Sequence, residues 1–147
     1  MNGAQIKNII LIVLSAAGSF VAEHLGGVDK LLTSLIAFMV VDYVTGLAVA
    51  FIFHKSQKTE NGGASSAVGF KGIVKKMSIL LLVGLAHELD YIMGIDYIRA
   101  LSILFFIGNE GLSVLENVGL MGVPYPEFLK KALEAIKDKG NKGDKDE

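Results

Sequence analysis

Four stretches of the chain are apolar for long enough to cross a membrane, and polar segments separate them. They cover residues Ile6–Leu25, Leu31–Phe53, Met77–Met93 and Ile98–Met121. A helix needs about 20 apolar residues to span the hydrocarbon core of a bilayer. The third stretch is the weakest, because its apolar run ends in His87, Glu88 and Asp90. The pattern predicts an all-α integral membrane protein with four transmembrane helices, or three if Met77–Met93 only dips into the membrane.

A fifth periodic segment follows the last of these stretches. Pro124 and Pro126 end one helix and precede another, and apolar residues then recur at helical spacing from Phe128 to Ile136. This pattern predicts a short amphipathic helix on the inner membrane surface, with a solvated helix or a contact with another subunit as alternatives. Gly140–Glu147 carries no apolar residue and is expected to form a charged, disordered tail. We therefore divide the chain into a transmembrane part, residues 1–126, and a cytoplasmic part, residues 127–147.

Charge is concentrated near the C-terminus. The 147 residues are 52% hydrophobic and include 14 basic and 15 acidic side chains, of which twelve lie in Glu127–Glu147. The remaining 126 residues carry too little charge to cover the surface of a soluble domain, which again favours a membrane protein. The net charge of −1 gives no indication of a nucleic-acid partner. The absence of cysteine excludes disulfides and thiol chemistry.

The placement of lysine predicts the orientation in the membrane. Residues His54–Lys76 hold five lysines and the C-terminal part holds six, whereas Glu23–Lys30 holds one and Asp90–Tyr97 holds none. Lysine and arginine are enriched in short cytoplasmic loops. Four helices place the lysine-rich loop, the tail and both termini inside, so a multi-pass protein with cytoplasmic termini is expected. The polar, Gly/Ser-rich loop Lys55–Ser66 is expected to be mobile.

Polar side chains within two of the spans are candidate pore-lining groups or helix–helix contacts. Asp42 lies near the middle of its span, where a charged aspartate costs about 2.5–3.5 kcal/mol, so it should be protonated, paired or facing water. In the last span, six polar residues fall within an arc of about 120° at helical periodicity. They are Ser102, Asn109, Glu110, Ser113, Glu116 and Asn117. This polar arc could surround water in an assembly of several copies, or form a polar seam inside one copy.

Small residues at four-residue spacing predict close helix packing. The pairs are Ser15 with Ser19, Gly18 with Ala22, and Gly46 with Ala50. Such pairs let helix backbones approach closely inside a membrane. The first segment is not expected to be a cleaved signal peptide, because its apolar core before Ser15 is only Ile9–Leu14.

The sequence shows no arrangement typical of catalysis or cofactor binding. His87, Glu88 and Asp90 could be imagined as a metal site, but adjacent side chains on a helix diverge. Gly62-Gly63 lacks the context of a phosphate-binding loop. We expect no cofactor, no metal and no enzymatic activity.

Several motifs in a fixed order resemble those of the toxin-secretion/phage-lysis holin family. They are Asp42-Tyr43-Val44-Thr45-Gly46, the Gly69–Lys76 segment GFKGIVKK, the Asn109–Asn117 segment NEGLSVLEN, and Gly122-Val123-Pro124-Tyr125-Pro126 before a lysine-containing helix. The resemblance runs from about Ile6 to Leu133, nearly the whole chain.

This resemblance implies a bacteriophage or prophage protein of the cytoplasmic membrane of a Gram-positive host. Such proteins associate with themselves and open lesions through which an endolysin, or in some relatives a large toxin, leaves the cell. Two alternatives remain open at this point. One is a small transporter or channel subunit with Asp42 and Glu110 as proton or cation sites, and the other is an antiholin-type membrane regulator.

Overall fold

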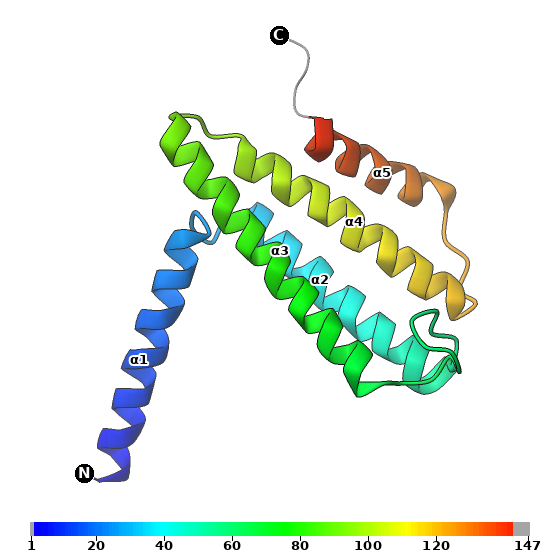
Figure 1. Ribbon diagram of the computed structural model, residues 1–147, viewed down its shortest axis with the longest axis horizontal. Helices are drawn as coiled ribbons and strands as arrows, with labels where there is room; N and C mark the ends of the chain where they lie inside the picture. The colour runs from blue at the N-terminus through cyan, green and yellow to red at the C-terminus, as the bar shows by residue number, and fades with distance from the viewer. Residues whose placement is uncertain (1, 143–147) are drawn as a thin grey trace.

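The computed structural model describes residues 2–142, and these residues are mainly helical (Figure 1). The elements are α1 (Gly3–His24), α2 (Lys30–Ala48), a short π-helix η1 (Val49–Phe53), α3 (Ser66–Met93), α4 (Ile98–Leu120) and α5 (Glu127–Lys142). This confirms the all-α class. Three of these helical segments are long and apolar enough to cross a membrane: α1, α2 continued by η1, and α4.

Helix α3 differs most from its predicted extent. It begins at Ser66 rather than Met77, because the lysine-containing segment before the apolar run continues the same helix. Its 28 residues span about 42 Å, enough to cross a bilayer by length. Its composition does not meet the apolar criterion that α1, α2 with η1, and α4 satisfy. The third predicted span is therefore a helix that is longer and less apolar than the other three predicted spans.

Local sequence signals set the ends of the helices. Asn2 and Gln5 form a reciprocal capping box at the start of α1, with both hydrogen bonds at 2.9 Å. The Asp29 carboxylate accepts a hydrogen bond from the Leu32 amide and caps α2. Gly94 ends α3 in the left-handed conformation, with φ of 68°, which a glycine adopts without strain.

Helices α2, α3 and α4 form the core of the molecule, and α5 packs on the outer side of α4 (Figure 1). The buried apolar side chains come from all three core helices: Leu32, Leu35 and Met39 of α2, Ile79 and Val83 of α3, and Ile103 and Ile107 of α4. Ile136 of α5 packs against this cluster from outside. The contact between α5 and α4 differs from the predicted position of the amphipathic helix on the membrane surface. Residues 140–142 of the predicted disordered tail belong to α5, and residues 143–147 lie outside the described part of the chain.

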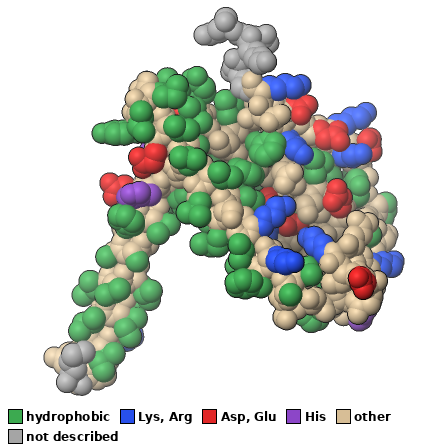
Figure 2. All heavy atoms as spheres, in the orientation of Figure 1, with side chains coloured by type: hydrophobic (Ala, Val, Ile, Leu, Met, Phe, Trp, Pro, Cys, Tyr) green, Lys and Arg blue, Asp and Glu red, His purple; other side chains and the backbone are tan. Residues whose placement is uncertain are grey.

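Helix α1 points away from the core and carries no buried residue over its described length (Figure 1). It meets the core only near its C-terminal end, where a Cβ built on Gly84 of α3 would lie 3.4 Å from the His24 carbonyl. Large apolar side chains along α1 are therefore exposed, as Figure 2 shows. Because water would disfavour such a surface, α1 needs lipid or another protein around it.

Hydrogen bonds from Arg99 link the connection between α1 and α2 to the start of α4. Its guanidinium donates hydrogen bonds to the carbonyls of Leu25 and Gly27, at 2.5 and 3.0 Å, and to the Asp29 carboxylate at 2.6 Å. Asp90, at the end of α3, accepts hydrogen bonds from the backbone amides of Ile98 and Arg99, both at 2.9 Å. The start of α2, the end of α3 and the start of α4 therefore lie together at one end of the core.

The Arg99 contact predicts a pH response of Asp29. The guanidinium holds the pKa of the Asp29 carboxyl below its ordinary value, and the Leu32 amide adds to this effect. The charged carboxylate therefore stabilises the fold at neutral pH, and this contribution is lost as the pH falls through the lowered pKa. Arg99→Gln should raise the pKa of Asp29 toward its ordinary value of about 3.9, measured by NMR titration of the carboxyl in micelles. An unchanged titration midpoint would contradict this role of Arg99.

Candidate functional site

A buried ion triad joins the three core helices near the lysine-rich end of the molecule. Lys76 of α3 contacts the Asp42 carboxylate of α2 at 2.8 Å and also donates a hydrogen bond to Glu110 of α4. All three side chains are largely buried, and that of Glu110 is only 3% exposed. Burial of a lone charge is strongly unfavourable, so each carboxylate depends on the ammonium group between them.

Asn117 extends this triad along α4. Its side-chain amide donates hydrogen bonds to the Asp42 carboxylate at 3.2 Å and to the Thr45 hydroxyl at 3.0 Å. Gly46 lies one residue beyond Thr45, and a Cβ built there would be 3.7 Å from the Asn117 side-chain nitrogen. Gly46 thus lies directly beside the asparagine between α2 and α4, and a methyl group there would make an ordinary van der Waals contact with it. We call Asp42, Lys76, Glu110 and Asn117 the polar seam.

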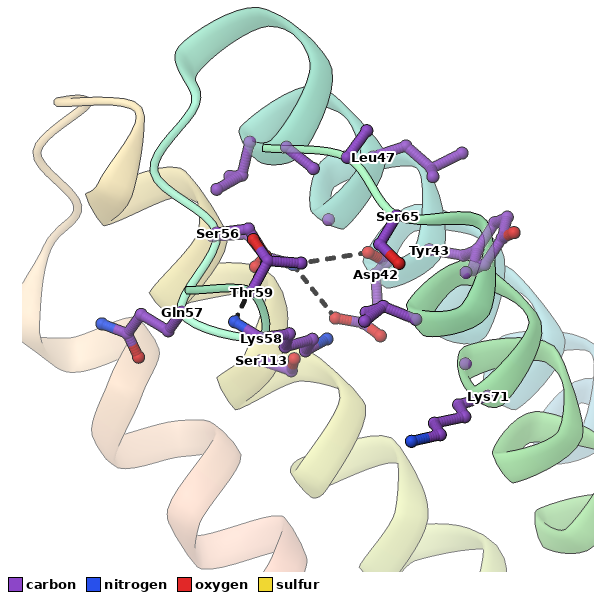
Figure 3. A pocket seen from close by; sticks show the side chains of 18 of the residues that line it. Asp42, Tyr43, Leu47, Ser56, Gln57, Lys58, Thr59, Ser65, Lys71 and Ser113 are labelled. Atoms are coloured by element: carbon purple, nitrogen blue, oxygen red, sulfur yellow. Dashed lines mark hydrogen bonds between the residues drawn. The ribbon is translucent and has the colours of Figure 1, made fainter. Parts of the chain in front are cut away.

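A cavity of about 390 Å³ opens beside the polar seam (Figure 3). The cavity lies between the connection that follows η1 and the ends of α2, α3 and α4. Its polar lining comes from Asp42, Glu110, Ser113, Glu116 and Asn117, from the Ser56–Thr59 stretch of the connection, and from Lys71, Lys75 and Lys76. The loop that was expected to be mobile closes over this cavity, with a hydrogen bond from the Ser56 amide to the Gly62 carbonyl at 2.9 Å.

The structure brings together only part of the predicted polar arc. Glu110 and Asn117 lie in the polar seam, while Ser113 and the exposed Glu116 line the cavity. Ser102 instead donates a hydrogen bond to the Ile98 carbonyl at 2.8 Å, near the other end of α4. Asn109 is half-buried and lies outside the cavity lining. Within one chain, two members of the arc, Glu110 and Asn117, bond to α3 and α2 respectively.

The predicted small-residue pairs fall into two groups. Gly46 and Ala50 both line the cavity beside the polar seam. On α1, Ser15, Gly18 and Ser19 are exposed and Ala22 is half-buried. No described atom lies within 4 Å of a Cβ built on Gly18, so this stripe has no packing partner inside the described chain.

Lys76 is the residue of the site that sequence reasoning missed, because it was assigned to a loop. A usable signal was present in the sequence. A cationic partner is one way to stabilise two carboxylates inside apolar helices, and Lys76 directly precedes the apolar run that starts at Met77. His87, Glu88 and Asp90 were considered as a metal site in the sequence. In the structure the Asp90 carboxylate instead accepts backbone hydrogen bonds at the start of α4.

Removal of the shared cation should destabilise the protein. Lys76→Met leaves Asp42 and Glu110 buried without a partner and should lower the free energy of unfolding by roughly 3–5 kcal/mol. Thermal unfolding in detergent and abundance in the membrane measure this effect. Lys75→Met, at an exposed neighbouring lysine, is the matched control. Neutralising the carboxylates as well, with Asp42→Asn and Glu110→Gln, should recover most of the loss, and a wild-type melting curve for Lys76→Met would contradict the triad.

Comparison with known proteins confirms the resemblance found in the sequence. The sequence model of the bacteriophage holin family matches residues 19–138. An uncharacterised protein of Listeria innocua is 38% identical over 126 residues, which cover 85% of this chain and 84% of that protein. The probable holin of Bacillus phage phi105 is 31% identical over 126 residues, which cover 84% of this chain and 87% of that protein. No solved structure matches the chain significantly. The chain therefore belongs to the bacteriophage holin family.

Proposed function

We propose that the protein is a holin that associates with itself in a bacterial cytoplasmic membrane and opens lesions. Membership of the bacteriophage holin family is the observation that carries this proposal. The lesions release a cytoplasmic cargo, an endolysin or a large toxin, so the protein supports lysis or secretion without chemistry of its own. Among the described residues, no group of three or more His, Asp or Glu side chains is placed to hold a metal ion.

Self-association is supported by the surface of α1. This helix is long and apolar enough to span a membrane, yet it contacts its own chain only near one end. One face of α1 carries the small, exposed residues Ser15, Gly18 and Ser19. Because these side chains are small, another helix can pack closely on this face. Lipid covers the remaining apolar side chains, so the bilayer and further copies of the chain are the proposed partners.

The polar seam gives each copy a stable core before a lesion forms. Asp42, Glu110 and Asn117 act as helix–helix contacts in this proposal, because their polar atoms are already paired across α2, α3 and α4. The same pairing argues against the transporter alternative, in which these carboxylates bind a transported cation. The position of that cation is taken by Lys76.

The proposed topology has four membrane crossings, with α3 as the third. Lys71, Lys75 and Lys76 at its start lie at the same end of the core as the loop that follows η1. Asp29, Asp90 and Arg99 lie together at the opposite end. Since lysine-rich ends face the cytoplasm, both termini and Ser56 are inside and Asp29 and Asp96 are outside.

Cysteine labelling in intact cells tests this topology. The chain has no native cysteine, so a single introduced cysteine is the only reactive thiol. A membrane-impermeant maleimide, applied before lysis, should label Asp96→Cys and leave Ser56→Cys unlabelled. Labelling of Ser56→Cys from outside would contradict the four-crossing topology.

Timed induction in a bacterium tests the function. Growth should continue normally for a period, after which the membrane potential should collapse abruptly. A co-expressed muralytic enzyme without a signal sequence should then reach the cell wall and lyse the culture. An antiholin would only delay lysis by another protein. Retention of the enzyme while the protein accumulates in the membrane would refute the proposal.

A further inference from the structure

Helix α5 lies antiparallel to α4 and touches its backbone. A Cβ built on Gly108 would lie 2.5 Å from the Lys137 Cβ, and one built on Gly140 would lie 2.2 Å from the Phe105 backbone nitrogen. A Cβ on Gly111 would lie 2.5 Å from a methyl carbon of Leu133. The two helices can approach this closely only because glycine occupies these positions. We call the face of α4 formed by Leu101, Phe105, Gly108 and Gly111 the α5 seat.

The opposite face of α5 is strongly charged. Leu133, Ile136 and Gly140 are half-buried toward α4. The exposed charged residues of the helix are Glu127, Lys131, Glu134, Asp138, Lys139 and Lys142. Figure 2 shows basic and acidic side chains gathered along the part of the molecule where α5 lies, whereas α1 is covered with hydrophobic side chains. The 16 residues of α5 extend over about 24 Å, most of the thickness of a bilayer core of about 30 Å.

The charged outer face of α5 is incompatible with direct contact with lipid acyl chains. Helix α4 is long and apolar enough to span a membrane, and α5 in its seat lies beside it from Gly111 to Leu101. In an intact bilayer the outward charges of α5 would then meet acyl chains, where each charge strongly disfavours insertion. The seat itself consists of Leu101, Phe105, Gly108 and Gly111, which are apolar side chains and glycine that lipid can cover when α5 is absent.

We propose that α5 occupies its seat only where water has replaced lipid along α4, and that its charged face then lines the lesion. While the membrane is intact, α5 stays in the aqueous phase or at the cytoplasmic surface. This inference rests on the proposed holin function and names the element that forms the hydrophilic wall. It also leaves the polar seam intact, because α5 covers a different face of α4 from Glu110 and Asn117.

A cysteine pair across the seat reports when α5 is docked. Leu133→Cys removes the methyl carbons that lie 2.5 and 3.0 Å from a Cβ at position 111, which makes room for Gly111→Cys. Cells that express the double variant are oxidised with diamide at intervals, and free thiols are counted by mass-tagging with a maleimide. Each single variant alone controls for cross-links between copies. The pair should remain reduced while the membrane potential persists and become cross-linked when the potential collapses.

Two results would overturn the inference: complete cross-linking before depolarisation, and absence of the cross-link after it. A second variant covers the case in which the cysteine pair disturbs folding. Gly108→Leu fills the seat where a Cβ alone already meets Lys137, so insertion should persist and depolarisation per embedded molecule should be delayed or lost. Gly3→Leu is the control, because nothing lies within 4 Å of a Cβ there. Wild-type timing for Gly108→Leu would also overturn the inference.

The inference and the proposed function fail in different measurements. Depolarisation and enzyme release are measured on the wild-type chain, without any substitution. A wild-type chain that never depolarises cells refutes the holin proposal. A wild-type chain that does so, with Gly108→Leu equally fast, leaves the holin proposal standing and removes α5 from the lesion wall.

Discussion

The contact on which the structure most depends is the ammonium group of Lys76 between the carboxylates of Asp42 and Glu110. Each of these three charges comes from a different core helix, and none of them would be stable in this environment alone. Their mutual pairing therefore fixes how α2, α3 and α4 lie against one another. Apolar packing of Leu35, Val83 and Ile103 fills the space between the helices, but such contacts are not directional. The ion triad selects one arrangement among those that apolar packing would allow.

Helix α4 has two faces with different partners. The face with Glu110 and Asn117 is satisfied inside the chain by α2 and α3, whereas the glycine-containing face takes α5. The free energy of the α4–α5 contact depends on whether lipid or water surrounds it, because α5 carries its charges on its outer face. The contact of α4 with α2 and α3 does not depend on this. In the proposed mechanism, the permanent contacts and the conditional contact with α5 therefore lie on different faces of one helix.

The sequence predicted the existence of all five α-helices because hydrophobic periodicity is a local property. The caps at Asp29 before α2 and Gly94 after α3 are local in the same way, although they were not predicted. All six residues of the predicted polar arc lie on α4, but the sequence left open whether they face water or protein. Glu110 and Asn117 face protein because Lys76 and Asp42 pair with them. The predicted start of α3, Met77, lies one residue after Lys76, so the sequence did not place this lysine on a helix. The α5 seat was also missed, because periodicity shows that α5 is amphipathic but not which surface its apolar face contacts.

The most direct test of the account is a simultaneous recording, in single induced cells, of membrane potential and of the escape of a cytoplasmic fluorescent protein. The proposed lesion releases a folded protein cargo as well as ions, so we predict that the loss of potential and the escape of the fluorescent protein begin together and abruptly. A gradual loss of potential in cells that retain the fluorescent protein would instead indicate a small ion-conducting pathway and would contradict the account.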